Sequence, residues 1–150
     1  MKAFSLPDGS TLIDPSNIVL FGFQPEELQL EHWTYLLENS FKSYTAPTVS
    51  KDSVAKAKEA LKWLEEKVDH VMLHFDVDVI DSGVFPLGNY PHYYGLGFEE
   101  VMGALEVFVK GEKLVGVCVT EVNPNNDPDG VMVGRLVDGI VKALRGRLNG

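Results

Sequence analysis

The apolar residues of this chain fall into short, mainly apolar runs and into longer periodic segments. Runs of this kind are typical of strands buried on both faces, because a strand with one face in water alternates apolar and polar residues. Such runs predict strands at residues 18–23, 71–81 and 113–122, and a further short strand is expected around residues 41–44. The run at 71–81 differs from the others because it ends in acidic residues.

The segments between these runs repeat apolar residues at three- and four-residue steps, which predicts amphipathic helices. One helix is expected to begin at Pro25 and to run to about Glu38, and a second to follow Ser50, a good N-cap. A third is expected at residues 98–110, and a fourth after Asp129, which is placed to cap it. The last helix carries apolar residues that are expected to face the core: Val133, Leu136, Val137, Ile140, Val141 and Leu144.

This alternation of strands and helices predicts one α/β domain covering residues 1–150, with three αβα layers around a mainly parallel sheet. Parallel strands are joined by right-handed crossovers, so the carboxyl ends of all strands lie at the same edge of the sheet. Ligands of such sheets bind outside that edge. Polar residues that follow the strands are therefore the first candidates for a functional site.

Acidic residues occupy this position after two of the predicted strands. Asp76 and Asp78 end the run at 71–81, and Glu121 lies near the end of the run at 113–122. Alternate side chains of a strand share a face, so Asp76 and Asp78 are expected to point the same way. Two adjacent carboxylates repel each other unless a cation or a proton lies between them, and their oxygens suit hard cations such as Mn²⁺ or Mg²⁺. Glu121 is suited to a cationic substrate group, since a carboxylate pairs with a guanidinium through two parallel hydrogen bonds.

Composition narrows the choice of partners. The formal net charge of −9 argues against nucleic acid and anionic membranes as partners, and it favours cations. The only cysteine, Cys118, lies in the apolar run at 113–122 and is expected to be buried and inert. A single cysteine forms no disulfide within the chain, and residues 1–10 hold no long apolar segment, so a cytoplasmic location is expected.

Two ordered motifs give the chain a family resemblance. Residues 74–81 read HFDVDVID and residues 120–124 read TEVNP, with a Gly-, Pro- and Tyr-rich loop between them. These motifs and their spacing resemble the second half of the arginase/agmatinase/formiminoglutamase family, the ureohydrolases. The resemblance is sharpest over residues 70–125.

The resemblance implies a partial arginase-like fold, a binuclear Mn²⁺ site and hydrolysis of the C–N bond of a linear amidine or guanidino compound. Asp76 and Asp78 match two of the metal-binding aspartates of the family. Glu121 matches the glutamate that meets the guanidinium-like group of the substrate. His92 and Tyr90, in the loop over the site, are further candidates for substrate contact.

Other residues near the motifs have two interpretations each. Tyr93 and Tyr94 either wall a substrate pocket or pack the loop onto the sheet. His74 shares the predicted face of Asp76 and Asp78 but lies deeper in the strand. It is expected to be a hydrogen-bonded core residue or a donor behind the metal ligands rather than a ligand.

The chain also departs from the family pattern. Family members run to about twice its length, in keeping with a larger single domain. Their first half carries Gly-Gly-Asp-His and Asp-Ala-His-x-Asp, which supply the other metal ligands, and neither motif occurs in this sequence. Two carboxylates do not complete the ligand shells of two Mn²⁺ ions. We therefore expect a half-domain that binds metal weakly alone and whose open sheet edge is covered by an N-terminal-half partner or by a second copy.

Two alternative functions stay open. A non-catalytic interaction or regulatory domain would retain the fold and dispense with the missing histidines. The Asp-x-Asp at residues 76–78 also resembles the nucleophile motif of haloacid-dehalogenase-like phosphatases, but residues 121–123 do not supply the acidic pair of that family.

Overall fold

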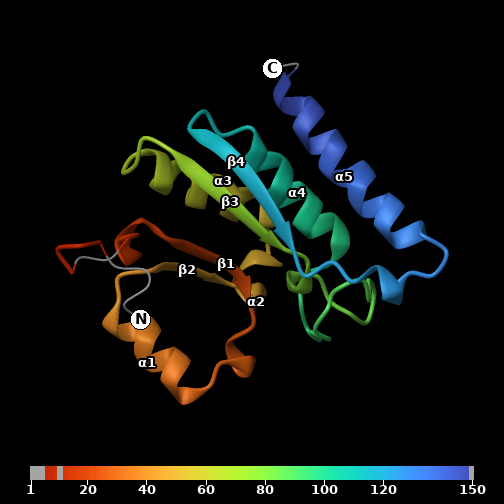
Figure 1. The fold of residues 1–150 in the computed structure, drawn as a ribbon, viewed down its shortest axis with the longest axis horizontal. Coiled ribbons are helices and arrows are strands. Elements are labelled where there is room, and N and C mark those ends of the chain that lie inside the picture. The colour runs from red at the N-terminus through yellow and green to blue at the C-terminus, as the bar shows by residue number, and fades with distance from the viewer. Residues whose placement is uncertain (1–5, 10–11, 149–150) are drawn as a thin grey trace.

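The strands of this protein form two parallel pairs. The computed structural model describes residues 6–9 and 12–148, and its strands are β1 (Val19–Phe23), β2 (Lys42–Thr45), β3 (Val71–Asp76) and β4 (Leu114–Thr120). β1 pairs with β2, and β3 pairs with β4. All of them run in the same direction, and β1 and β3 lie between β2 and β4 (Figure 1). The predicted α/β fold with parallel strands is confirmed, but in the described chain its sheet is divided between β1 and β3.

Helices flank the strand pairs. The helices of the described chain are α1 (Leu30–Glu38), α2 (Ala46–Val49), α3 (Ser53–Glu65), α4 (Phe98–Val109) and α5 (Val131–Leu148). α3 and α4 lie against one face of the β3–β4 pair, and α5 packs beside α4 (Figure 1). On the strands themselves, Met72, His74 and Cys118 are exposed. The predicted burial of Cys118 is therefore wrong, because in the described part of the chain no element covers its side chain.

Two predicted helix starts are also corrected. Pro25 begins a single 3₁₀ turn, Pro25–Glu27, and α1 starts only at Leu30. α3 is capped by Asp52, whose carboxylate accepts the N–H of Ala55 at 2.9 Å. Ser50 ends α2 instead, because the short helix before it takes up the residues between β2 and α3.

The start of α5 is capped by two aspartates. Asp129 accepts the N–H of Val131 at 3.3 Å, in the predicted role. Asp127 accepts the N–H groups of Met132 and Val133 at 3.1 and 2.7 Å. Asp127 is the main cap of this helix, because it accepts two N–H groups and both of its hydrogen bonds are shorter than that of Asp129.

The predicted core face of α5 is only partly correct. Leu136 is buried, and Val133 and Ile140 pack against the core. The remaining residues of that face are 50, 36 and 38% exposed: Val137, Val141 and Leu144. Periodicity identifies the apolar face of a helix but does not show whether a neighbour covers it. None of the described helices combines the length and the apolar character that crossing a membrane requires.

One apolar core connects both strand pairs. Phe21 of β1 packs edge-on against Phe108 of α4, with ring centroids 5.1 Å apart. The loop after β3 contributes side chains that are at most 2% exposed: Ile80, Phe85, Leu87 and Leu96. This loop is therefore part of the core, and its backbone beside the acidic residues is held in place by packing.

Tyr44 of β2 gives a test of the packing between β2 and α3. Its hydroxyl donates to Glu59 Oε1 at 3.0 Å, and burial, together with this carboxylate, raises the pKa of Tyr44 to about 12. The folded state holds this proton more tightly than the unfolded chain, so the contribution to stability is complete below pH 10.0 and is lost toward about 12. We expect Tyr44→Phe to lower the free energy of unfolding by about 1 kcal/mol near neutral pH and to reduce the alkaline loss. Urea unfolding at several pH values measures both, and an unchanged alkaline slope would contradict the assignment.

Candidate functional site

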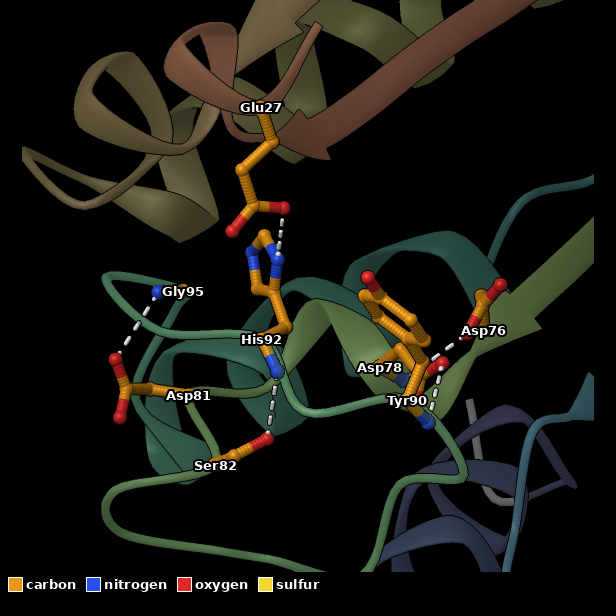
Figure 2. Close-up of polar contacts among 8 residues, drawn as sticks. All are labelled: Glu27, Asp76, Asp78, Asp81, Ser82, Tyr90, His92 and Gly95. Atoms are coloured by element: carbon orange, nitrogen blue, oxygen red, sulfur yellow. Dashed lines mark hydrogen bonds and ion pairs between the residues drawn. The ribbon is translucent and has the colours of Figure 1, made fainter.

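Asp76 and Asp78 come together through a turn rather than along one strand. Asp76 is the last residue of β3, and the chain then passes through the 3₁₀ turn Val77–Val79. Asp76 Oδ1 accepts the N–H of Asp78 at 2.9 Å and so caps this turn. The predicted strand alternation is wrong at Asp78, because β3 ends two residues earlier. Both carboxylates nevertheless lie at the carboxyl end of β3 (Figure 2).

The loop after β3 holds the carboxylate of Asp78. Both of its oxygens lie 3.2 Å from the backbone nitrogen of Tyr90, which donates to them. A Cβ at Gly88 would overlap Asp78 Oδ1, so a glycine is needed for the loop to pass this close. Gly88 was not among the residues predicted from the sequence, although its place between the acidic motif and Tyr90 was a signal for such a contact.

Glu121 directly follows β4 and has a left-handed backbone, with φ of 61°. Residues other than glycine seldom adopt this conformation, and it is concentrated at functional sites. Two backbone bonds connect its segment to the loop after β3. The N–H of Asn89 donates to the Glu121 carbonyl at 2.8 Å, and the N–H of Asn123 donates to the Leu87 carbonyl at 3.0 Å. The ends of β3 and β4 therefore converge, as the sequence predicted.

The converging carboxylates affect one another. The pKa of Asp78 is raised by burial and by the negative charges of Asp76 and Glu121, although the N–H of Tyr90 acts in the opposite direction. Asp78 is therefore repelled by two acidic neighbours, Asp76 and Glu121. A bound cation would relieve this repulsion.

The loop histidine contacts a different part of the molecule. His92 Nδ1 lies 2.6 Å from Glu27 Oε2, and the backbone N–H of His92 donates to Ser82 Oγ at 2.9 Å (Figure 2). His92 thus connects the loop after β3 to the turn after β1. Its imidazole does not point at Asp76 and Asp78 in this structure.

The remaining aromatic and histidine candidates are exposed. Tyr90, Tyr93 and Tyr94 are 71, 57 and 82% exposed, so they do not pack the loop onto the strands. His74 is exposed as well, and its Nε2 lies 2.7 Å from Thr120 Oγ1. The interpretation of His74 as a core residue is therefore wrong, because the described chain leaves its side chain uncovered.

The donor set fits part of a metal site. Asp76 and Asp78 offer the carboxylate oxygens that hard cations and Mn²⁺ prefer. Across residues 6–9 and 12–148, no group of three or more His, Cys, Asp or Glu side chains is arranged to hold a metal ion. The described chain therefore offers carboxylates of the kind that bind such a cation, but no group of them large enough to hold one.

Comparison with known proteins finds arginases. An arginase of Bacillus caldovelox is 28% identical over 116 residues, which make up 77% of this chain and 38% of the relative. The chain thus spans about two fifths of the length of this curated relative. The solved structure of an arginase from the same organism matches with a TM-score of 0.75 and 27% identity, over 92% of this chain and 44% of the arginase.

Formiminoglutamases share the fold as well. The formimidoylglutamase of Bacillus subtilis matches with a TM-score of 0.80 and 20% identity, over 90% of this chain and 42% of the other. A formiminoglutamase of Trypanosoma cruzi, solved with Mn²⁺, matches with a TM-score of 0.75 and 19% identity, over 87% of this chain and 44% of the other. The model of the Arginase family matches residues 4–144. The chain therefore belongs to the arginase family.

Proposed function

We propose that this chain supplies part of the metal site and of the substrate site of an arginase-family hydrolase. The reaction would be hydrolysis of the C–N bond of a linear amidine or guanidino compound, once the rest of the domain is bound. The convergence of Asp76, Asp78 and Glu121 at the ends of β3 and β4 carries this proposal. Membership of the arginase family supports a hydrolytic role for these carboxylates, because the relatives are arginases and formiminoglutamases.

Asp76 and Asp78 are the proposed metal ligands. Their oxygens suit Mn²⁺, and the formiminoglutamase of Trypanosoma cruzi was solved with this metal. When bound, a divalent metal lowers the pKa of a coordinated water and so makes a nucleophile available near neutral pH. The chain's own contribution is to hold the two carboxylates at one strand end, through the cap at Asp76 and the N–H of Tyr90.

Glu121 is the proposed partner of the cationic group of the substrate. Its strained backbone is fixed by the loop after β3, so the carboxylate is presented by a rigid segment. The exposed ring of Tyr90 is available for substrate contact beside Asp78. His92 is the proposed positioning residue of this site, because its contact with Glu27 holds in place the loop that carries Tyr90.

Metal titration of the chain tests the incomplete site. We expect the chain alone to bind Mn²⁺ no more tightly than a dissociation constant of about 0.1 mM, because two carboxylates are too few for a high-affinity site. Isothermal titration calorimetry measures this. Tight binding of two ions per chain would refute the idea that the site is incomplete.

The hydrolysis itself requires a complementary polypeptide. We expect urea or formamide release from guanidino or formimino substrates only when Mn²⁺ and the portion of the Bacillus caldovelox arginase outside the matched region are both present. Glu121→Gln should reduce release by about 30-fold or more, because it removes one partner of a charged pair, an effect of about 2 kcal/mol or more. Release by the chain alone, or undiminished release by the variant, would contradict the proposed roles.

A non-catalytic interaction domain is the second candidate function. The incomplete ligand set of the described residues favours it. In that case the chain would bind its complement without any release of urea or formamide. The same assay therefore separates the two functions.

A further inference from the structure

The last helix carries a row of apolar side chains that the described part of the chain leaves exposed. The side of α5 that faces the core carries Leu136 and Ala143, each 3% exposed, and the helix packs there beside α4 (Figure 1). Another side carries four apolar residues that are 50, 36, 38 and 83% exposed: Val137, Val141, Leu144 and Leu148. These four residues are called the α5 stripe below. Contiguous exposed apolar residues of this kind mark an interaction surface more often than a bare one.

The spacing of the α5 stripe is that of a coiled coil. Its members follow one another at steps of four, three and four residues. Alternating steps of this kind define the a and d positions of a heptad, the positions that form the seam between two packed helices. Val141 and Leu148 then occupy a positions, and Val137 and Leu144 occupy d positions. The stripe is therefore suited to another helix rather than to a flat surface.

Two charged side chains flank the α5 stripe. Asp138 and Arg145 each directly follow a d position and so occupy the e positions beside the seam. Both side chains are exposed, and neither makes an ion pair or a hydrogen bond within residues 6–9 and 12–148. Charges at e positions select the partner of a coiled coil and its orientation.

The other cations of α5 have partners within the chain. Arg135 pairs with Glu99 at 2.9 Å, and Arg147 donates to the Val109 carbonyl at 2.8 Å. The charge of Lys142 acts on a carboxylate of α4. Arg145 is therefore the arginine of this helix that stays available to a second molecule.

An antiparallel pair of α5 helices satisfies the stripe and the charges in one register. In such a pair, a positions of one helix face d positions of the other. Placing Val141 opposite the partner's Leu144 also places Val137 opposite the partner's Leu148, so all four members are covered. The same register places Asp138 beside the partner's Arg145. Two-fold symmetry repeats each contact, which gives two ion pairs at the flanks of the seam.

The alternative arrangements lack this agreement. Shifting the antiparallel register by one heptad places Asp138 beside the partner's Asp138, or Arg145 beside the partner's Arg145. A parallel pair places apolar residues opposite both charges, Val133 and Ile140, and both of these pack against the core of their own chain. The charges of α5 therefore select the register in which the apolar residues match.

We propose that two copies of this chain associate through the α5 stripe, with their α5 helices antiparallel. A second copy fits as the occupant because it carries both the apolar row and the two complementary charges at matching positions. The association goes beyond the proposed function and does not depend on it, since no residue of the stripe belongs to the proposed metal or substrate site.

Sedimentation equilibrium of the purified chain tests the association. We expect a reversible dimer with a dissociation constant of about 100 µM or below, because an interface of one helix from each copy is small. A chain that stays monomeric up to about 1 mM would overturn the proposal.

Val141→Asp tests the stripe itself. Val141 faces the partner's Leu144 in two layers of the dimer, so the substitution would bury two unpaired carboxylates and should weaken association by about 30-fold or more. Val131→Asp is the matched control, because Val131 is 65% exposed at the first position of α5 and lies outside the seam. Circular dichroism checks the folding of both variants. Equal association by the two variants would overturn the proposal.

A charge exchange tests the antiparallel register. Asp138→Arg alone brings two cations together at each flank of the seam, and Arg145→Asp alone brings two anions together. Each should weaken association by about fivefold or more. The variant with both substitutions restores opposite charges at both flanks and should associate within about twofold of the parent. Single variants without effect, or a double variant without recovery, would overturn the proposal.

A different occupant of the stripe would give a different result. The portion of the Bacillus caldovelox arginase outside the matched region is the alternative polypeptide, and it can be added to the parent and to Val141→Asp. A monomeric parent whose complex with this polypeptide is weakened by Val141→Asp would assign the stripe to that polypeptide and reject the second copy. Mn²⁺ binding and product release are measured separately, so rejection of the dimer leaves the test of the proposed function unchanged.

Discussion

Phe85→Ala is expected to lower the free energy of unfolding by about 3–5 kcal/mol, the range for removing a buried aromatic ring. The Phe85 side chain is 2% exposed, and its ring centroid lies 4.7 Å from that of Phe98 at the start of α4. Truncation would leave a cavity beneath the loop after β3. The same loop supplies the N–H of Tyr90 to Asp78, so the loss of packing should also loosen the site. Urea unfolding followed by circular dichroism measures the loss of stability.

Val84→Ala is the matched control for this substitution. Val84 precedes Phe85 in the same loop but is 66% exposed, so its truncation should change the free energy of unfolding by about 0.5 kcal/mol or less. The comparison separates the effect of burial from that of altering the loop sequence. Similar losses in the two variants would show that the loop is not packed through Phe85.

The sequence predicted the elements that carry the site because strong local signals define them. The mainly apolar run before Asp76 predicts a strand, and the structure has β3 there, although Met72 and His74 on it are exposed. The run before Glu121 likewise forms β4 and ends beside β3. Parallel pairing then brings the two strand ends together, which is why the convergence of the acidic residues followed from chain order alone.

The wrong predictions concern properties that depend on neighbouring elements. Cys118 and Val141 belong to apolar patterns typical of buried residues, yet both are exposed in the described chain. A pattern records which surface a segment is suited to bury, whereas exposure depends on what lies against it. The division of the strands into two pairs also depends on neighbouring elements, because a strand edge is paired only where another strand lies next to it.

The detailed contacts of the site could not be predicted from the sequence for a different reason. Asp78 lies in a 3₁₀ turn, and the contact between His92 and Glu27 joins segments far apart in the chain. Neither a turn of three residues nor a pairing across 65 positions leaves a periodic signal in the sequence. Gly88 is the exception, since a glycine two positions before Tyr90, a predicted substrate contact, can indicate a close backbone approach.

Asp78→Asn is expected to weaken metal binding and to stabilise the metal-free chain. Removing a hydrogen-bond partner of a ligand costs about 10–100-fold in metal affinity, so replacing a ligand itself should cost at least as much. The amide oxygen can still accept the N–H of Tyr90, while the charge repelled by Asp76 and Glu121 is lost. Water-proton relaxation detects weak Mn²⁺ binding and measures the first effect on the chain alone.

The stabilising effect has a defined pH dependence. Burial and the two acidic neighbours raise the pKa of Asp78 above 3.8, so the unfavourable charge is absent at lower pH and develops as the pH rises through the raised value. Asp78→Asn should therefore match the parent in acid and exceed its unfolding free energy by about a few tenths of a kcal/mol near neutral pH, a small effect because solvent screens the charges.

Asp81→Asn is the control for Asp78→Asn, because it separates a structural role in the loop from a role in metal binding. The Asp81 carboxylate accepts the N–H groups of Gly83 and Gly95 at 2.7 and 3.1 Å, and an amide cannot accept both. This variant should lose about 1 kcal/mol of unfolding free energy and keep its affinity for Mn²⁺. If Asp78→Asn instead loses stability and keeps its metal affinity, Asp78 serves the loop in the way Asp81 does. The three acidic residues would then be a consequence of the fold and not a site built to hold positive charge.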